Sequence, residues 1–192
     1  MKRAVPIALG FLLCAAPLVL RSGDTSEAEP RPLPALARWL GPIGNLAAGL
    51  QWVRADTAFR RNDDIVGFAR AELALALDPG ATGTWSLLAQ RQMLQRAAPG
   101  RGTTPAERRA WIEAGRETLR RGLATARAPE ELWFLEGYLL MFCAERDPEL
   151  GWPGGDQAIL QEAWTALDRA AQLGHREAME LAQLVHDVAH DH

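Results

Sequence analysis

The sequence is poor in several residue types that mark whole classes of protein. Its 192 residues include one Lys, one Tyr, two Asn and three Ser. Cys14 and Cys143 lie far apart in the chain, so we expect no disulfide framework. Nowhere do Val, Ile and Thr alternate with polar residues over five positions, and this excludes a clear β-strand pattern. No long block of like charges occurs, which argues against a disordered tail protein.

Alanine and arginine are abundant instead. The chain contains 34 Ala and 20 Arg, a usage typical of a GC-rich bacterial genome. Both residues favour helix. The length suits one domain of ordinary size. The composition therefore favours a single helical domain.

The first 21 residues differ from the rest. Lys2 and Arg3 precede an uncharged apolar run over residues 4–20, which is just long enough to cross a bilayer. The pattern is typical of a cleaved secretory signal or of an uncleaved signal anchor. We favour the anchor, because Pro17 would follow the cleavage site after Ala16. By the positive-inside rule the N-terminus is then cytoplasmic. This predicts a single-pass inner-membrane protein with its C-terminal domain in the periplasm.

Residues 22–34 are acidic and rich in proline, which predicts a stiff, extended linker before a domain at 35–192. Without Lys2, Arg3 and Arg21, 18 basic residues remain against 24 acidic ones, a formal charge of −6. Nucleic-acid binding would need a basic stripe and stacking aromatic residues. We therefore expect no nucleic-acid partner.

The domain is predicted to be helical throughout. Asn62 or Asp63 can cap one helix, Thr104 begins a capping box, Asp156 can cap another, and Gly174 can end a helix in a left-handed turn. The expected helices cover residues 35–40, 43–61, 64–77, 83–97, 105–127, 129–145, 157–173 and 176–189.

Helix 105–127 has the clearest amphipathic pattern. Small and apolar residues recur at three- and four-residue spacing and predict one packed face: Trp111, Gly115, Leu119, Gly122, Leu123 and Ala126. On the other face, Arg109 with Glu113 and Glu117 with Arg121 are predicted as i,i+4 ion pairs. The small residues in the packed face allow close approach of a second helix, as tandem helical repeats require.

Two segments carry repeat motifs. Ala74-x-x-Leu77-Asp78-Pro79 followed by Trp85-x-x-Leu88-Ala89 resembles the junction between two tetratricopeptide repeats. The series Ala163-Trp164-x-x-Leu167-x-x-Ala170-Ala171-x-x-Gly174-His175-x-x-Ala178-x-x-Leu181-Ala182 resembles a Sel-type repeat, a related unit. The intervals Trp52 to Trp85 and Trp133 to Trp164 have the length of helix-hairpin repeats.

This resemblance implies an all-α fold, a right-handed solenoid of α-hairpins with about seven helices, here preceded by one transmembrane helix. Such scaffolds bind protein segments, so the resemblance implies no enzyme activity and no cofactor. We expect a protein partner, in particular a membrane complex. The candidate protein-binding residues are Trp52, Trp85, Gln92 and Trp152. Trp152 lies between Gly151 and Pro153 in a loop, where it either anchors an interface or folds back over the domain.

The stretch from Leu132 to Ala144 is apolar except at Glu136, which predicts the central helix of the domain. In the competing interpretation its outer face docks on a membrane protein. Cys143, within this stretch, is interpreted as a small buried hydrophobic residue. His175 is interpreted as a residue of a repeat junction.

Two further hypotheses remain. His186, His190 and His192 offer imidazoles at i and i+4 near the C-terminus, a spacing that can bind zinc or another transition metal. The alternative for these histidines is a solvated last turn near the negative helix end. A metal-binding protein or metal-dependent enzyme is therefore one alternative function, and a structural spacer of the cell envelope is another.

Overall fold

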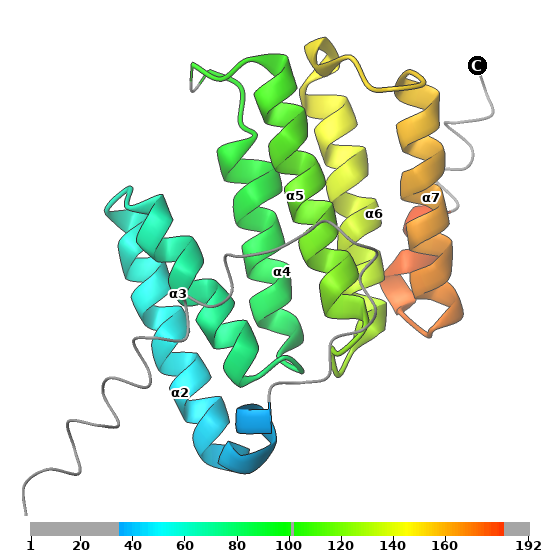
Figure 1. Cartoon of the computed structure of the whole chain (residues 1–192). Helices are drawn as coiled ribbons and strands as arrows, with labels where there is room; N and C mark the ends of the chain where they lie inside the picture. The colour runs from blue at the N-terminus through cyan, green and yellow to red at the C-terminus, as the bar shows by residue number, and fades with distance from the viewer. Residues whose placement is uncertain (1–34, 101, 183–192) are drawn as a thin grey trace, which may run out of the picture.

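A computed structural model describes residues 35–100 and 102–182, and within these residues the fold is all-α with no strand (Figure 1). The all-α prediction is therefore confirmed. The predicted anchor at 1–21, the linker at 22–34 and the C-terminal histidines lie outside the described residues. Among the helices that are described, none has the length and apolar character needed to span a bilayer.

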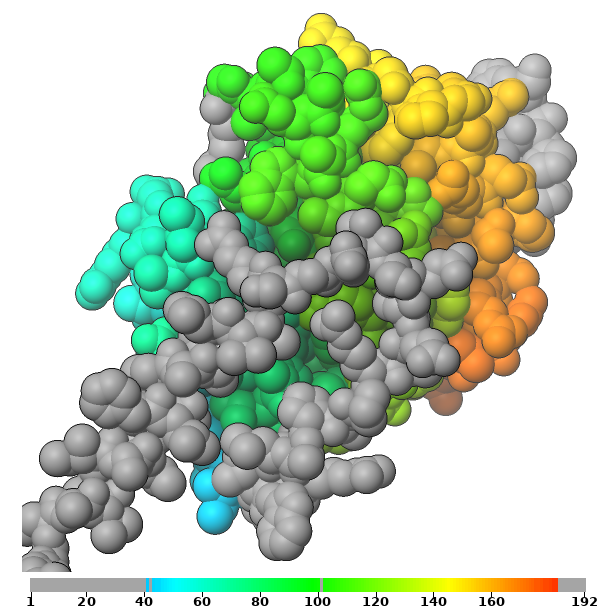
Figure 2. All heavy atoms as spheres, viewed as in Figure 1, coloured from blue at the N-terminus to red at the C-terminus, as the bar shows by residue number. Residues whose placement is uncertain are grey.

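The helices follow one another as packed pairs, α2 with α3, α4 and η1 with α5, and α6 with α7 (Figure 1). In the space-filling view the same segments succeed one another from the cyan α2–α3 pair to the orange α7 (Figure 2). A last helix covers residues 176–182 and reaches the end of the described chain. The elements are α2 (Ala35–Arg60), α3 (Asp64–Leu77), α4 (Thr82–Gln90), η1 (Arg91–Arg96), α5 (Pro105–Leu123), α6 (Pro129–Arg146), η2 (Pro148–Leu150) and α7 (Asp156–Gln172).

Three of the four predicted helix-end positions are correct. The Asp63 carboxylate accepts a hydrogen bond from the Val66 amide at 3.2 Å. The Thr104 hydroxyl accepts from the Glu107 amide at 3.2 Å, and the Glu107 carboxylate accepts from the Thr104 amide at 2.7 Å, which completes the capping box. Gly174 has a φ of 98°, as a left-handed helix end requires.

The start of α7 differs from the prediction. Asp156 is the first helical residue, and the cap position is Gly155, whose φ of 82° suits a residue without a side chain. Asp156 therefore lies one position too late to cap the helix. Its carboxylate contributes only a negative charge to the first turn, where the helix dipole favours it.

The predicted helix over 83–97 is present but not regular. It starts as α4 and continues as the six-residue π-helix η1, in which the Ala97 amide donates to the Gln92 carbonyl at 3.1 Å. A π-turn holds one more residue than an α-turn, and no feature of the apolar spacing signals it.

The charges on α5 also pair differently from the prediction. Glu113 contacts Arg116 at 3.0 Å and Glu117 contacts Arg120 at 3.5 Å, both at i,i+3 spacing. Arg121 instead reaches Glu72 of α3 at 2.6 Å. An exposed i,i+4 pair contributes only about 0.2–0.5 kcal/mol, so contacts to other helices decide the geometry.

The packed face of α5 agrees with its prediction. Gly115, Leu119 and Gly122 are buried, and a Cβ built on Gly122 would lie 2.8 Å from atoms of both Trp85 and Leu132. Gly137 of α6 is similarly close to Leu167 of α7. Small residues thus set the spacing between successive helices, and one apolar core extends from α2 to α7.

Candidate functional site

Of the four predicted protein-binding residues, three are buried in the domain. Trp85, Gln92 and Trp152 are each less than a tenth exposed, and Trp52 is half-buried against the core. Trp85 donates its indole N–H to the Pro79 carbonyl at 2.8 Å, and Gln92 accepts from the Thr118 hydroxyl at 2.8 Å. These contacts give Trp85 and Gln92 a role inside the fold.

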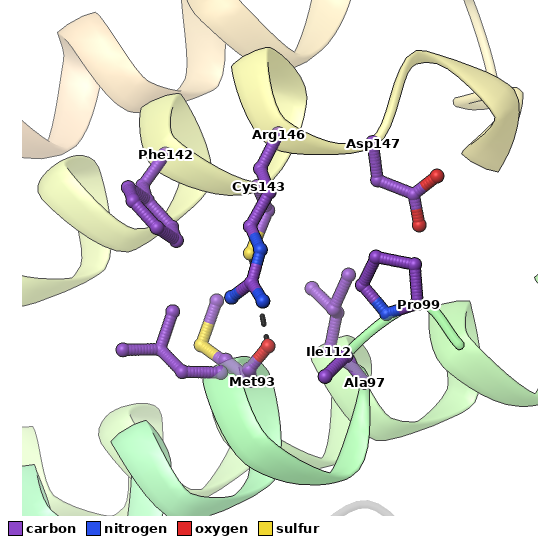
Figure 3. Close-up of a pocket in the computed structure, with 10 residues that line it drawn as sticks. Met93, Ala97, Pro99, Ile112, Phe142, Cys143, Arg146 and Asp147 are labelled. Atoms are coloured by element: carbon purple, nitrogen blue, oxygen red, sulfur yellow. Dashed lines mark hydrogen bonds between the residues drawn. The ribbon is translucent and has the colours of Figure 1, made fainter. Parts of the chain in front are cut away.

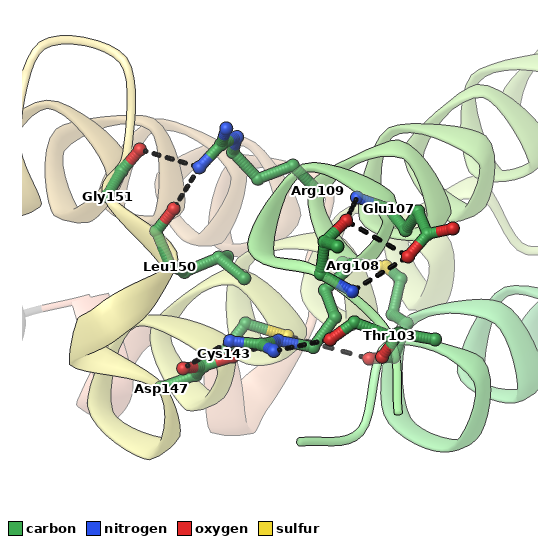
Figure 4. Close-up of polar contacts among 10 residues, drawn as sticks. Thr103, Glu107, Arg108, Arg109, Cys143, Asp147, Leu150 and Gly151 are labelled. Carbon is green, nitrogen blue, oxygen red and sulfur yellow. Dashed lines mark hydrogen bonds and ion pairs between the residues drawn. The ribbon is translucent and has the colours of Figure 1, made fainter. Parts of the chain in front are cut away.

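The loop that carries Trp152 is fixed by two arginines from the start of α5 (Figure 4). The Arg108 guanidinium contacts Asp147 at 2.8 and 3.2 Å and also donates to the Thr103 carbonyl at 3.1 Å. Arg109 donates to the carbonyls of Leu150 and Gly151. Trp152 consequently folds back over the domain and joins the core, the second of its two predicted alternatives.

The outward side of α6 carries three stacked aromatic rings, Phe134, Tyr138 and Phe142, which we call the aromatic ladder. The ring centroids lie 6.2 Å apart between Phe134 and Tyr138, and 6.5 Å apart between Tyr138 and Phe142. Tyr138 is 41% exposed, while Leu139 and Leu140 behind it are buried. Phe134 and Phe142 are half-buried, and Phe134 packs against the cluster of Leu167 and Ala182, so Tyr138 is the exposed ring at the centre of the row.

A basic or ionisable side chain covers each end of the aromatic ladder. His175 stacks on Phe134 with ring centroids 4.1 Å apart, and Arg146 lies with its guanidinium carbon 5.6 Å from the Phe142 centroid. The His175 Nδ1 accepts from the Ala178 amide at 3.3 Å, and Nε2 lies 3.6 Å from Glu131. His175 stands between α7 and the helix at 176–182, a location consistent with the predicted repeat junction.

Beside Phe142 lies a shallow apolar hollow between η1 and α6 (Figure 3). It is lined by Met93, Leu94 and Ala97 on one side and by Phe142, Cys143 and Arg146 on the other. Burial raises the pKa of the Cys143 thiol to about 12, so the thiol stays protonated at neutral pH and is a poor nucleophile. The predicted burial of Cys143 is confirmed.

Arg116 of α5 joins three helices through glutamates. It contacts Glu113 at 3.0 Å, Glu136 of α6 at 3.3 Å and Glu162 of α7 at 2.5 Å. Burial raises the pKa of the Glu136 carboxyl, and the charge of Arg116 opposes that shift. Because Arg116 is surrounded by carboxylates of the same domain, we interpret the cluster as a structural tie between helices.

The described residues contain no group of three His, Cys, Asp or Glu side chains arranged to hold a metal ion. His186, His190 and His192 lie beyond these residues, so the metal hypothesis stays a prediction. No protein-family model, curated protein or solved structure matches the chain.

Sequence reasoning overlooked the aromatic ladder, although a signal was present. Phe134, Tyr138 and Phe142 recur at every fourth position, the spacing that places side chains in one row on a helix. The three rings lie in the apolar stretch predicted as the central helix of the domain, and the competing interpretation, an outer face that docks on a membrane protein, names none of them. Tyrosine carries a hydroxyl that favours contact with water, and this favours an exposed position at the centre of the row.

Proposed function

We propose that this protein is a membrane-tethered helical-repeat adaptor, an accessory subunit of a membrane complex that acts through protein contacts on the extracytoplasmic side. The aromatic ladder on α6 is the observation that carries the proposal. In this proposal the apolar run at residues 4–20 anchors the chain and 22–34 is the spacer. The domain catalyses no reaction.

The helix pairs support a tetratricopeptide-like arrangement. Asp78 and Pro79 stand at the turn between α3 and α4, where the motif implies that one repeat closes and the next opens. That turn is bonded to the turn between α5 and α6, because the Arg127 amide donates to the Gly80 carbonyl at 3.1 Å and Arg127 contacts Asp78 at 2.6 Å. Bonded turns between successive helix pairs are what a stack of repeats needs.

The proposed binding surface combines the aromatic ladder with Leu87 of α4. Leu87 is 47% exposed, and α4 packs against α6. Tyrosine and phenylalanine give a partner a large contact area at a low entropic cost, since each ring has only two rotatable bonds. Glu131, Glu145 and Arg146 of the same helix are exposed, so charges of both signs border the ladder. The surface therefore suits a partner segment with apolar side chains.

The test is co-purification of the full chain from gently solubilised membranes, with partner recovery measured by quantitative mass spectrometry. Tyr138→Ala should reduce the recovery of one defined partner at least about tenfold, as expected when a central aromatic contact is removed. Leu173→Ala is the matched control, because Leu173 is exposed to a similar degree at the end of α7. Unchanged recovery with Tyr138→Ala, or no stoichiometric partner with the native chain, would contradict the proposal.

A further inference from the structure

The face of α2 that points away from α3 is apolar. Ile43, Leu46, Leu50 and Val53 are 67%, 76%, 53% and 61% exposed. The opposite face of the same helix packs against α3 and is also apolar, with Ala48, Ala55 and Phe59 buried. A helix at the edge of a domain normally has a polar outer face. The outer face of α2 therefore needs a partner.

The spacing of these four residues indicates what kind of partner fits. They follow one another at intervals of three, four and three residues, which is the a and d pattern of a coiled-coil heptad. A face that packs on a flat core or rests on a membrane is broader than this row. A row this narrow fits another helix lying almost parallel to α2.

The residues beside the row argue against a membrane surface. The positions beside the row hold two small residues and one charge of each sign, Ala47, Gly49, Arg54 and Asp56, rather than a basic border. A helix that lies on a bilayer has Lys and Arg along the border of its apolar face. Small flanking residues instead allow a second helix to approach closely. We propose that the α2 row, defined as Ile43, Leu46, Leu50 and Val53, binds the same row of a second copy of this chain.

Charge selects the direction of the two helices. In a parallel pair, a heptad g position on one helix faces the e position five residues later on the other helix. Asp56 is at a g position and therefore faces Arg61 of the other copy. In an antiparallel pair with Leu46 opposite Leu50, Asp56 would lie level with position 40, beyond the break that Gly41 makes in the helix with φ 45° and ψ −129°, so no helical partner position faces it. Asp56 and Arg60 already form an exposed pair within one chain. An exposed ion pair of this kind contributes little to stability. Asp56 can therefore replace its contact with Arg60 by one with Arg61 of the second copy at a small cost in free energy.

The row is short, so the dimer is expected to be weak. A stable interface buries about 800 Å² on each partner, more than four side chains provide. The helix is already formed and held by α3, so pairing requires no helix nucleation. If residues 4–20 anchor the chain as proposed above, two copies in one membrane also meet at a raised effective concentration. The inference itself does not depend on that anchor.

Cysteine cross-linking of the full chain in detergent micelles tests the pairing and its direction. Ile43→Cys and Val53→Cys are made in a Cys14→Ser background, with Met179→Cys as an equally exposed control at the other end of the domain. We expect Ile43→Cys and Val53→Cys each to form a disulfide-linked dimer, and Met179→Cys to stay monomeric. Disulfides that form only when the two α2 variants are mixed would indicate antiparallel helices and overturn the proposed register.

Sedimentation equilibrium in density-matched detergent gives an independent readout. Leu50→Glu should raise the dissociation constant at least about 100-fold, because two carboxylates would face each other in the row. It should leave the circular dichroism and the partner recovery through Tyr138 unchanged. A native chain that is monomeric at every concentration would overturn the inference and leave the proposed function standing.

If residues 4–20 or lipid covered the α2 row instead, labelling experiments would give different results. With Cys14 retained, Leu50→Cys would form an intramolecular disulfide if the chain's own residues 4–20 covered the row. A spin label at Leu50→Cys would be protected from aqueous quenchers in a strictly monomeric chain if lipid covered it. Either result would overturn the proposed dimer.

Discussion

The N-terminal pair α2–α3 and the central pair α5–α6 distribute polar and apolar residues in opposite ways. The N-terminal pair exposes Ile43, Leu46 and Ile65. The central pair buries Arg108 and Glu136, each with its charged partner. In these residues burial is thus set by position in the fold rather than by residue type.

Side chains serve different purposes in the two pairs. In the centre, arginines reach across helices and fix their relative positions, as Arg108 does with Asp147 and Arg116 with Glu136. At the edge, α2 packs mainly against α3, with Arg91 of η1 reaching its Phe59, and the outer residues of α2 remain available for a partner. Substitutions in the centre should therefore change stability, and substitutions at the edge should change association.

The largest expected effect concerns the buried ion pair of the central region. Arg108→Met would leave the Asp147 carboxylate buried without its cation and should lower the free energy of unfolding by about 3–5 kcal/mol. Arg60→Met removes one partner of an exposed pair in α2 and should cost less than about 0.5 kcal/mol. Urea unfolding of both variants measures the difference. Equal losses would erase the distinction between the two regions.

Replacing a glycine by alanine should lower the free energy of unfolding in the central region and raise it in the N-terminal region. A Cβ on Gly137 would lie 2.7 Å from the Ala163 carbonyl oxygen, so Gly137→Ala should destabilise by about 1–3 kcal/mol. A Cβ on Gly49 of α2 would meet no atom within 4 Å, and Gly49→Ala should stabilise by about 0.5–1 kcal/mol. Thermal unfolding compares the two variants. Stabilisation by Gly137→Ala would show that α6 and α7 can move apart.

The smallest expected effect is a pH dependence that originates in the central region. Because burial raises the pKa of Glu136 in the folded chain, the folded state holds its proton more tightly than the unfolded state. The contribution of this group to stability is present below the ordinary carboxyl pKa. It is lost as the pH rises from that value through the raised one.

Glu136→Gln removes this titration. The stability of the native chain relative to Glu136→Gln should therefore fall as the pH increases from about 4 to 7. Denaturant unfolding at several pH values measures it. A difference that instead grows with pH would mean that the attraction of Arg116 outweighs the cost of burial.

Local features of the fold could be predicted from the sequence because they depend on neighbouring residues. The Asp63 cap and the Thr104 capping box are examples, and so is the left-handed Gly174. Each is set within a few residues by backbone groups that need a partner or by a φ that glycine favours. The packed face of α5 was predictable for a similar reason, since helix periodicity is a local property.

The candidate site was predicted less well, because exposure depends on residues far apart in the chain. The position of Trp152 is determined by Arg109, 43 residues earlier, which holds the backbone of the loop. Trp85 and Gln92 are buried because α5 covers them. The residues next to them in the sequence do not indicate this burial. Large aromatic residues serve cores and interfaces alike, so their identity alone does not distinguish the two.

The π-helix η1 also bears on how the chain accommodates insertions and deletions. The six residues Arg91–Arg96 fill a length of helix that fewer residues of an α-helix would fill. The segments before and after them therefore meet α5 in registers that differ by one residue. Gln92 and Met93 are buried inside this stretch, whereas Gln95 is exposed. Loss of one residue at Gln95 would convert the π-turn to an α-turn, so Ala97 would keep its place while the residues within the turn would shift relative to α5. In this fold, therefore, the number of residues in one turn determines which side chains of η1 reach the hollow beside Phe142.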